Sequence, residues 1–584
     1  MQDALVHNLI VNSRGKMPVG VSDFAKLVQG DYCFVDKSLF IKELLDSGDD
    51  VSLITRPRRF GKTMNLNMLR CFLHWPSNHQ PDLFEGLAIS RAGERYLQER
   101  GKRPVLFLTL KDIKAQNWHD AWIALRALLA DLAESSSRDA PVNALTRVQQ
   151  KTLYRVIEGE AEPAECRAIL AILTKLLTLK HNGLAPWILM DEYDTPMLEA
   201  YHYGYYDHMR DLIRGLLGQC LKDNPDPMQP GTFLHKAVIT GIVRVAKEDI
   251  FSDLNNLGVY GILEDRFSPC FGFTEPEVRQ LLAARKLANR FDDVRAWYDG
   301  YRIGADKPVT IYNPWSLTSY LANPTDTPRP YWVNTSSNEL VHSMVETRSN
   351  PQDKADVETL LLGGTIKKDL SNSLALRDLP NLSHALWNIL LTSGYVTAAH
   401  AMGGTIGSEA VLRIPNQEVR IAYGRLALRW FSEKSPDFLP NMLRSLEEGE
   451  VEIFAQELST FAQGSLSYFD FATSQPERVY HALMVGLVAG LSGRYRIRSN
   501  RESGAGRPDL LLIPYDAKKL GIVMEFKVVD SEDKLQQAAQ TALEQILQKD
   551  YADEFGDDKK SPPPLVFGIA FAGKQVQVKH KRLA

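Results

Sequence analysis

The chain has 584 residues, a formal net charge of -4, 44% hydrophobic residues and 24% charged residues, which is the composition of a soluble globular protein. It is too long for one hydrophobic core, so we expect about three domains. Its charge balance excludes a protein that is basic over its whole surface, although a local basic channel would leave the total unchanged.

The cysteines and the apolar stretches limit the cellular setting. The five cysteines are widely scattered, which argues against a disulfide framework or a zinc site and favours a reducing compartment. The N-terminus has no signal-peptide pattern, and the longest apolar stretch, residues 482–491, is too short to span a bilayer and predicts a buried helix. We therefore expect a cytoplasmic protein without a membrane segment.

The first motif follows a short β-branched run at residues 51–54 and precedes a segment with the apolar periodicity of a helix. The junction holds Gly61, Lys62 and Thr63. The glycine lets backbone N–H groups approach phosphate, the lysine can reach the β and γ phosphates, and the threonine hydroxyl can bind Mg²⁺. Arg56 stands where such a loop usually has its first glycine, so it must avoid a positive φ or tolerate strain. The alternative is a surface loop with a basic run.

Acidic and polar residues follow two further buried runs. Asp191 and Glu192 come directly after the apolar run 187–190, at the carboxyl end where ligands bind in open α/β sheets. Asp191 would hold the Mg²⁺ shell and Glu192 would polarise the attacking water, unless the pair is only an acidic turn. Thr240 ends another strand and could sense the γ-phosphate. Arg244 could meet the same charge or be an ordinary surface arginine.

Four separated blocks, in order, resemble the bacterial AAA-ATPase-like family: "MPVGVSDFAKLVQGDYCFVDKSLFIKELLD", "LITRPRRFGKT", "DEYDTPM" and "ITGIVRVAKEDIFSDLNNL". The resemblance covers residues 17–260, and the family's phosphate loop is similarly rich in arginine, so Arg56 fits it. It implies ATP as the nucleotide. Phe24 and Tyr32 could pack on the adenine, and the alternative is a place in the core. We predict an ATP site made of Arg59, Phe60, Gly61, Lys62, Thr63, Met64, Asp191, Thr240 and Arg244.

The middle of the chain predicts helices, turns and short strands. Thr274 and Glu277 have the spacing of a capping box, and Asn313 can cap a helix that begins at Pro314. This order suggests a winged-helix module. The stretch "NPWSLTSYLANP" contains no Lys or Arg, so a role as a lid or docking module is favoured over DNA binding. Residues 345–410 are predicted to be helices and loops.

The last strongly patterned stretch, "GRPDLLLIPYDAKKLGIVMEFKVV", predicts two strands joined as a hairpin. Alternate residues of a strand share a face, so Glu525 and Lys527 lie together while Phe526 faces the other way. The hairpin would bring Asp509 to Glu525, and two crowded carboxylates need a cation or a proton between them. Asp509 and Glu525 would bind Mg²⁺, and Lys527 would orient water or offset charge. The alternative is an exposed polar face.

The spacing of Pro508-Asp509 and Glu525-Phe526-Lys527 resembles the PD-(D/E)XK, or restriction-endonuclease-like, nuclease superfamily, over residues 460–584. The resemblance implies Glu477, on a preceding helix, as another metal ligand. It also implies Gln545 and Tyr551, on a following helix, as accessory residues. Glu477 could instead be a structural helix acid, and Gln545 an exposed helix residue.

Together these features predict an α/β multidomain protein. We expect a P-loop NTPase core at residues 1–262, a helical or winged-helix middle module at 263–409, and linker helices with a restriction-endonuclease-like α/β domain at 410–584. The predicted function is ATP-regulated, Mg²⁺-dependent cleavage of DNA or RNA. The alternatives are an ATP-switched signalling or nucleic-acid-binding protein whose nuclease-like domain does not cut, and an ATPase that remodels a nucleic-acid complex. Oligomerisation stays open.

Overall fold

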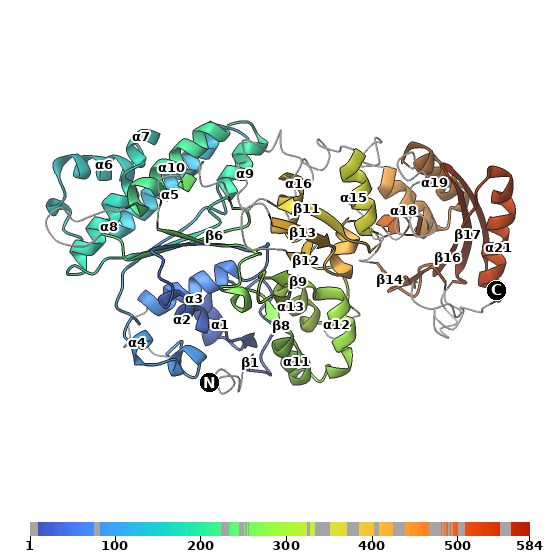
Figure 1. Cartoon of the computed structure of the whole chain (residues 1–584), viewed down its shortest axis with the longest axis horizontal. Coiled ribbons are helices and arrows are strands. Elements are labelled where there is room, and N and C mark those ends of the chain that lie inside the picture. The colour runs from blue at the N-terminus through green and yellow to red at the C-terminus, as the bar shows by residue number, and fades with distance from the viewer. Residues whose placement is uncertain are drawn as a thin grey trace. The chain divides into compact units, whose positions relative to one another are not determined.

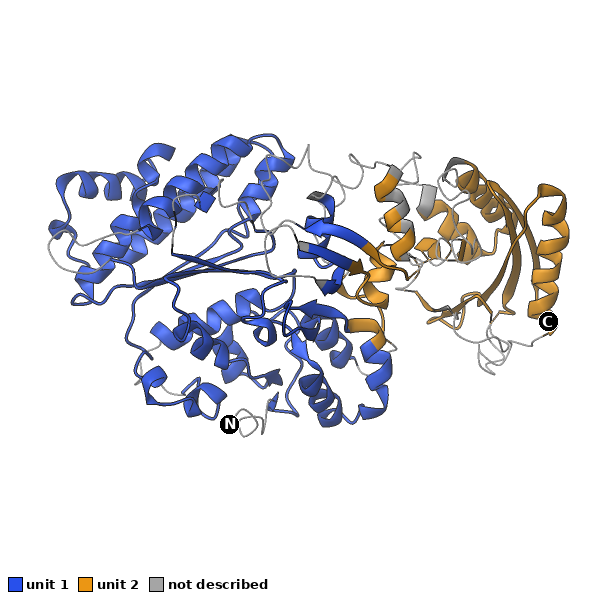
Figure 2. Ribbon diagram, in the orientation of Figure 1, with its two compact units in different colours: residues 1–295, 299–323, 367–411 blue, residues 296–298, 324–366, 412–584 orange. Residues whose placement is uncertain are grey.

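The computed structural model of the chain describes residues 10–74, 82–222, 233–244, 250–251, 254, 256–323, 328–332, 351–361, 363–370, 385–401, 408–423, 438–465, 480–481, 484, 486–488, 491, 494–499, 508–548 and 562–583. They form two compact units (Figure 2): residues 1–295, 299–323 and 367–411, and residues 296–298, 324–366 and 412–584. Within the described ranges, no helix has both the length and the apolar character needed to cross a membrane.

A five-stranded parallel sheet is the centre of the first unit. Its strand order is β4-β5-β6-β3-β7, and every neighbouring pair is parallel. The three buried strands predicted from apolar runs are confirmed, each extended by one to three residues. The strands are β3 (Val51–Thr55), β4 (Val105–Thr109), β5 (Trp187–Asp191), β6 (Lys236–Gly241) and β7 (Leu257–Tyr260).

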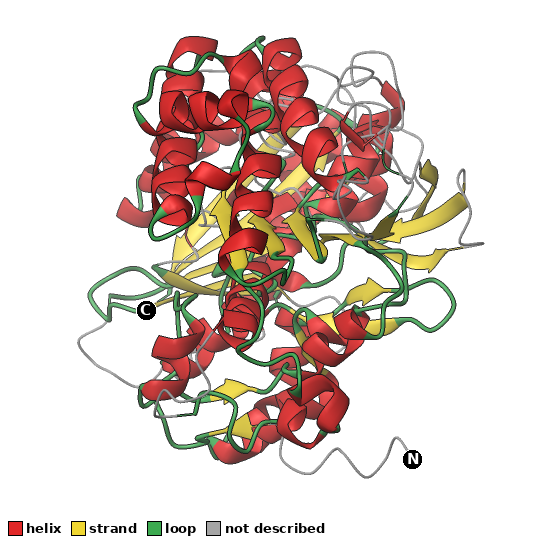
Figure 3. Ribbon diagram, turned by 90° about the vertical axis from the view of Figure 1, so that its left-hand side faces the viewer, coloured by secondary structure: helices red, strands yellow, loops and turns green. Residues whose placement is uncertain are grey.

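Helices cover both faces of this sheet, and Figure 3 shows the strands between helices above and below. On one face, α1 (Phe24–Gln29), α2 (Leu39–Leu45) and α3 (Lys62–His74) share a core with a two-stranded antiparallel sheet, β1 (Ile10–Val11) and β2 (Phe34–Val35). The other face carries the helices between β4 and β6 (Figure 1). These are α5 (Trp118–Ser137), α6 (Arg147–Ile157), α7 (Pro163–Cys166), α8 (Ile169–Lys180), α9 (Thr195–His202) and α10 (Tyr206–Leu221).

Two aromatic residues considered for the adenine belong to the first of these layers. Phe24 is 2% exposed and lies 5.2 Å, between ring centroids, from Phe84. Tyr32 packs against the same apolar cluster. Both are therefore core residues, as in the alternative considered for them.

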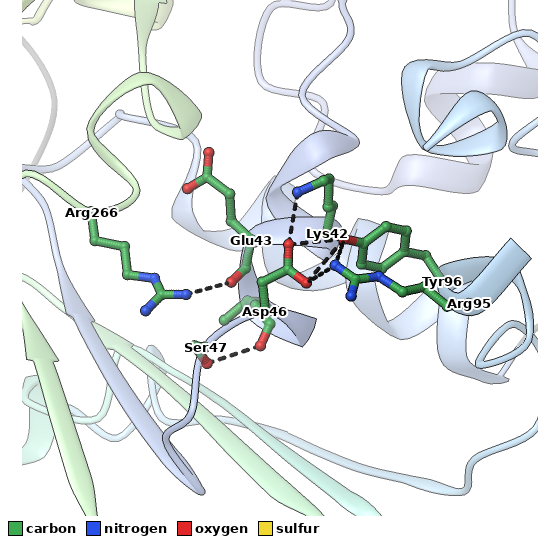
Figure 4. Close-up of polar contacts among 8 residues, drawn as sticks. Lys42, Glu43, Asp46, Ser47, Arg95, Tyr96 and Arg266 are labelled. Carbon is green, nitrogen blue, oxygen red and sulfur yellow. Dashed lines mark hydrogen bonds and ion pairs between the residues drawn. The ribbon is translucent and has the colours of Figure 1, made fainter. Parts of the chain in front are cut away.

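A polar network around Asp46 joins α2 to the short helix α4 (Glu94–Leu97) (Figure 4). The Asp46 carboxylate accepts hydrogen bonds from Lys42 Nζ at 2.7 Å, from Arg95 Nη2 at 2.7 Å and from Tyr96 Oη at 2.9 Å. Burial opposes ionisation of Asp46, but the bonds from Lys42 and Tyr96 outweigh it and lower the pKa of this carboxyl. The network helps to hold the layer that supports α3.

The segment after β7 contains a three-stranded antiparallel sheet of order β8-β10-β9 with three helices. Both predicted caps are confirmed. The Thr274 N–H donates to Glu277 Oε2 at 2.7 Å in a capping box, and Asn313 Oδ1 accepts from the N–H of Trp315 at 2.9 Å. The elements are β8 (Phe273–Thr274), α11 (Glu275–Ala284), α12 (Phe291–Tyr298), β9 (Tyr301–Ile303), β10 (Val309–Tyr312) and α13 (Pro314–Ala322).

The prediction of only helices and loops for residues 345–410 is wrong in part. Helices α15 (Pro351–Leu361) and α16 (Ala385–Thr392) are present, but β11 (Ile366–Leu370), β12 (Thr397–Ala401) and β13 (Ser408–Arg413) form a sheet of order β11-β13-β12. The sequence "IKKDL" is charged and "TAAHA" is rich in alanine, so neither has a strong intrinsic preference for strand. Pairing with neighbouring strands decides their conformation.

The second unit is built on a five-stranded sheet of order β14-β15-β16-β17-β18. The predicted hairpin is confirmed, because β15 (Leu510–Pro514) and β16 (Ile522–Val528) are antiparallel with Leu510 opposite Met524. The pair β16 and β17 (Leu565–Ala572) is parallel, and β14 (Tyr495–Ser499) and β18 (Gln575–Arg582) are antiparallel edge strands.

The two faces of this second sheet are covered by different helices. Met524 and Phe526 enter a core with residues of α18 (Phe438–Glu448) and α19 (Val451–Ser465). Val523 packs on the opposite face with Leu543 of α21 (Leu535–Gln548). The predicted alternation along β16 is therefore confirmed, and Glu525 and Lys527 share the face that α21 covers.

Candidate functional site

The loop that joins β3 to α3 has the backbone shape expected of a phosphate loop. Gly61 has φ +85°, and a Cβ at this position would meet nothing within 4 Å, so backbone conformation alone explains the glycine. Arg59 has φ +68°, an uncommon conformation for a residue with a side chain. Helix α3 begins at Lys62, so its first N–H groups and positive dipole end lie at the loop.

Arg56, at the position of the usual first glycine, is buried with 0% exposure. Its Nη1 donates to the carbonyl oxygens of Thr55, Tyr260 and Gly261 at 2.8, 2.9 and 2.7 Å, and its guanidinium lies 5.4 Å from the ring centroid of Phe271. Burial lowers the pKa of Arg56 to about 10. Its φ is not positive, so the loop starts without the strain considered from the sequence.

Three of the predicted ATP-site residues meet at one carboxylate. Asp191 Oδ2 accepts from Thr63 Oγ1 at 2.7 Å, and Asp191 Oδ1 accepts from Thr240 Oγ1 at 2.6 Å. Strand β6 lies between β3 and β5, so its end places Thr240 between the loop and the acidic strand. Lys62 Nζ donates to the carbonyl of Arg56 at 2.9 Å, inside the loop, and burial lowers the pKa of this lysine.

Two acidic residues follow Asp191 closely. Glu192 has φ +52°, and its Oε2 accepts from Thr195 Oγ1 at 3.3 Å. Asp194, which sequence reasoning missed, is fully buried and accepts from the backbone N–H groups of Ile242 and Val243, each at 2.8 Å. Burial raises the pKa of Asp194. Its place three residues after a buried strand end was the available signal, and its role is to hold the segment after Thr240.

The remaining predicted ATP-site residues have other surroundings. The Arg59 guanidinium lies 4.2 Å from the ring centroid of Trp315, and the Phe60 ring makes an edge contact with Tyr301. Met64 packs on the core of α1 to α3. In the described ranges, no hydrogen bond or ion pair connects Arg244 to the loop or to Asp191.

These residues fit a nucleotide with a divalent cation. Gly61 and the amino end of α3 present N–H groups to an anion, as phosphate binding requires. Thr63 and Asp191 offer oxygen ligands 2.7 Å apart, which a hard cation prefers. Lys62 would then hold the phosphates, and Glu192 follows the last residue of β5.

In the second unit, the two predicted acidic residues are in contact. The Asp509 N–H donates to Glu525 Oε2 at 3.3 Å, and Asp509 Oδ2 accepts from the N–H of Phe526 at 2.8 Å. Glu525 is only 4% exposed, and its Oε1 accepts a hydrogen bond from Gln545 Nε2. The prediction that the hairpin joins Asp509 to Glu525 is therefore correct, and Gln545 is not the exposed helix residue of the alternative.

A glycine allows α21 to bring Gln545 to this place. Gly568 of β17 is directly opposite Glu525 in the sheet, and a Cβ on it would lie 2.2 Å from the carbonyl oxygen of Ala539 and 2.4 Å from the N atom of Leu543. The backbone of α21 therefore rests on the sheet at Gly568. Sequence reasoning missed this glycine, whose only signal is its position inside an apolar strand.

Lys527 and His481 also lie close to Asp509 and Glu525. Lys527 lies next to Glu525 on the same face, opposite Ala570, and is half-buried. His481, also missed, has Nε2 at 2.9 Å from the Asp509 carbonyl oxygen, and its ring makes an edge contact with Phe526. Its position directly before the apolar run 482–491 was the available signal for His481.

Two further predicted residues cannot be placed. Glu477 and Tyr551 lie outside the described residues. Among the residues that are described, no group of three His, Cys, Asp or Glu side chains gathers as a metal site. Asp509 and Glu525, two residues in direct contact, nevertheless carry carboxylate oxygens, which are the ligands that Mg²⁺ prefers.

Two family models match the parts of the chain that contain the two candidate sites. Residues 18–251 match the family model described as "Predicted AAA-ATPase", and residues 475–581 match the PD-(D/E)XK nuclease superfamily. A protein of Azotobacter chroococcum mcd 1, named "Uncharacterized protein in vnfD 5'region", is 25% identical over 575 residues, which cover 96% of this chain and 97% of that protein. No solved structure matches the chain. The chain therefore carries an AAA-ATPase-like domain followed by a PD-(D/E)XK nuclease superfamily domain.

Proposed function

We propose that the protein is an ATP-switched, Mg²⁺-dependent nuclease. The observation that carries the nuclease half is the contact of Asp509 and Glu525 on a sheet face that also presents Lys527. The observation that carries the ATP half is the carboxylate of Asp191, shared by Thr63 and Thr240 beside the phosphate loop. DNA or RNA is the proposed substrate.

In the nuclease site, each residue has a distinct proposed task. Asp509 and Glu525 hold Mg²⁺, which when bound would polarise the phosphodiester and acidify a water molecule. The N–H of Phe526 fixes the Asp509 carboxylate, and Gln545 fixes that of Glu525, so both are oriented before substrate arrives. Lys527 orients the attacking water or offsets the negative charge that develops on the phosphate oxygens.

In the ATP site, Lys62 and the amino end of α3 hold the phosphates, and Thr63 and Asp191 hold the accompanying Mg²⁺. Glu192 accepts a hydrogen bond from Thr195 and orients the attacking water. Thr240 touches Asp191 directly, so a change at the γ-phosphate reaches β6 through one hydrogen bond. Asp194 holds the backbone N–H groups of Ile242 and Val243, which follow Thr240 closely in the chain.

For the middle module, we propose a lid or docking role on a winged-helix plan. The order of β8, α11, α12, β9 and β10, with β10 central in the antiparallel sheet, supports that plan. Helix α13 contains no Lys or Arg, and helix α12 begins with Asp292 and Asp293, so neither helix offers a run of cations to a DNA backbone. This lack of a basic run favours docking on protein over reading a DNA groove.

A cleavage assay with matched variants tests the nuclease proposal. Purified full-length protein is incubated with labelled single- and double-stranded DNA and RNA, with Mg²⁺, and with or without ATP. Asp509→Asn and Lys527→Met should abolish cleavage. Asp516→Asn and Lys518→Met, in the exposed loop of the same hairpin, should cut like the wild-type protein. Equal cleavage by all five proteins would exclude the assigned site.

The same assay, combined with a measurement of ATP hydrolysis, tests the proposed role of ATP. Lys62→Ala should lose ATP turnover, and its cleavage should no longer respond to ATP. If the wild-type protein hydrolyses ATP but no nucleic acid is cut under any condition, the second domain binds without cutting. The protein would then be an ATP-switched binding or signalling protein.

A further inference from the structure

The apex of the phosphate loop packs on the segment that follows the ATPase domain. The guanidinium of Arg59 lies 4.2 Å from the ring centroid of Trp315, within the range of a cation–π interaction. The next residue, Phe60, is 1% exposed and meets Tyr301 edge to face, with ring centroids 4.9 Å apart. Trp315 and Tyr301 come from α13 and β9, more than 240 residues along the chain.

The backbone at two glycines of later segments also approaches side chains of the phosphate loop. A Cβ built on Gly394, which has φ +87°, would lie 3.0 Å from Cβ of Pro57, and one built on Gly272 would lie 3.3 Å from Cδ1 of Phe60. Arg56 binds the carbonyls of Tyr260 and Gly261 from inside. The loop is therefore in contact with several segments that lie more than 200 residues further along the chain.

Arg59 needs such support because of its own backbone. A residue with a side chain occupies φ +68° only when its surroundings stabilise that conformation. The side chain of Arg59 rests on Trp315. Burial lowers the pKa of Arg59, and the negative charge of Glu192 acts in the opposite direction. Trp315 is itself held, since its N–H donates to the cap residue Asn313 at 2.9 Å.

We propose that Trp315 is a positioning residue for nucleotide binding, which with Tyr301 holds the phosphate loop in its binding shape through Arg59 and Phe60. These two contacts, Trp315 with Arg59 and Tyr301 with Phe60, are called the clamp, and they make ATP affinity depend on a segment outside the ATPase domain. This inference rests on the proposed binding of ATP by the loop.

Titration calorimetry tests the clamp by measuring the affinity of the full-length protein for Mg²⁺·ATP. Trp315→Leu removes the aromatic face and should weaken binding by about three- to tenfold. Trp315→Phe keeps a π face and should recover most of the affinity. The matched control is Trp297→Leu, a half-buried tryptophan on α12, which should bind ATP like the wild-type protein.

A second pair of variants distinguishes loss of the clamp from a general folding defect. Arg59→Gly meets the positive φ without strain, so the loop no longer needs Trp315. In that background, Trp315→Leu should cause no further loss of affinity. An equal loss from Trp315→Leu in both backgrounds would show that the tryptophan acts through the general fold and would overturn the clamp.

A third readout requires no nucleotide. Hydrogen exchange of the amides at residues 59–63 should be faster in Trp315→Leu than in Trp297→Leu, because the loop leaves its binding shape more often. If the wild-type protein binds no ATP at all, the proposed function fails. If the wild-type protein binds ATP and Trp315→Leu matches it in affinity and in exchange, only the clamp fails.

Discussion

The backbone N–H of Asp509 donates a hydrogen bond to Oε2 of Glu525 at 3.3 Å, so two acidic residues are in contact at one end of a buried hairpin. The Glu525 carboxylate is only 4% exposed, and a bound cation would favour its charged form. Mg²⁺ should therefore stabilise the second unit, by about 2.7 kcal/mol at one hundred times its dissociation constant.

Calorimetric unfolding with and without Mg²⁺ measures this stabilisation. The melting temperature of the wild-type protein should rise with Mg²⁺, and that of Asp509→Asn should not. Asp516→Asn, in the exposed hairpin loop, should keep the full rise. An undiminished rise in Asp509→Asn would place the bound ion elsewhere.

Gly568→Ala should disturb the nuclease site by displacing α21. The added methyl would lie 2.2 Å from the carbonyl oxygen of Ala539, so α21 must move away from the sheet and take Gln545 from Glu525. We expect a loss of about 1–3 kcal/mol in the free energy of unfolding and a clear drop in cleavage. Urea unfolding and the nuclease assay measure the two effects.

The control for that substitution is Gly218→Ala on α10. A Cβ there meets nothing within 4 Å, and alanine in a helix interior is more stable than glycine by about 0.5–1 kcal/mol. This variant should gain stability and cut normally. A similar result for Gly568→Ala would mean that α21 can shift without cost to the site.

Lys37→Met should destabilise the first unit strongly. Lys37 Nζ donates to both carboxylate oxygens of Glu277, at 2.7 and 2.8 Å, and the two side chains are 13% and 7% exposed. Removing the lysine leaves a buried carboxylate without its cation, which costs about 3–5 kcal/mol. Arg290→Met, which breaks an exposed pair with Asp293, should cost at most about 1 kcal/mol in the same urea titration.

Stability of the first unit should fall as the pH falls from 6.5 toward 4. Burial, assisted by the charge of Arg103, lowers the pKa of His235 to about 4, and its ring packs on Trp187. The unfolded chain binds a proton near pH 6.5 whereas the folded chain does not, so the contribution of His235 is complete above pH 6.5 and is lost through this window.

Allowing for partial exposure of the ring, the loss should be about 1–2 kcal/mol. Urea unfolding at pH 7.5 and pH 5 measures it, and His235→Gln should show a smaller difference between the two pH values. An unchanged difference would assign the acid sensitivity to other groups.

Local patterns predicted the parts of both sites that lie within one element. The apolar run before Asp191 and the alternation around Glu525 each depend on residues close in sequence, so periodicity alone was sufficient. The caps at Thr274 and Asn313 were predictable for the same reason. The contribution of Asp194 was not, because the two N–H groups it binds belong to a different strand end.

By itself, the sequence determined which segments are strands and helices at the sites, which side chains share a face, and that Gly61, Lys62 and Thr63 follow a buried strand. Only the tertiary structure decided that β6 lies between β3 and β5 and so brings Thr240 to Asp191. It also decided that α21 rests on Gly568 and that Trp315 supports Arg59. These contacts join residues far apart in the chain, and their formation depends on how whole layers pack rather than on local preference.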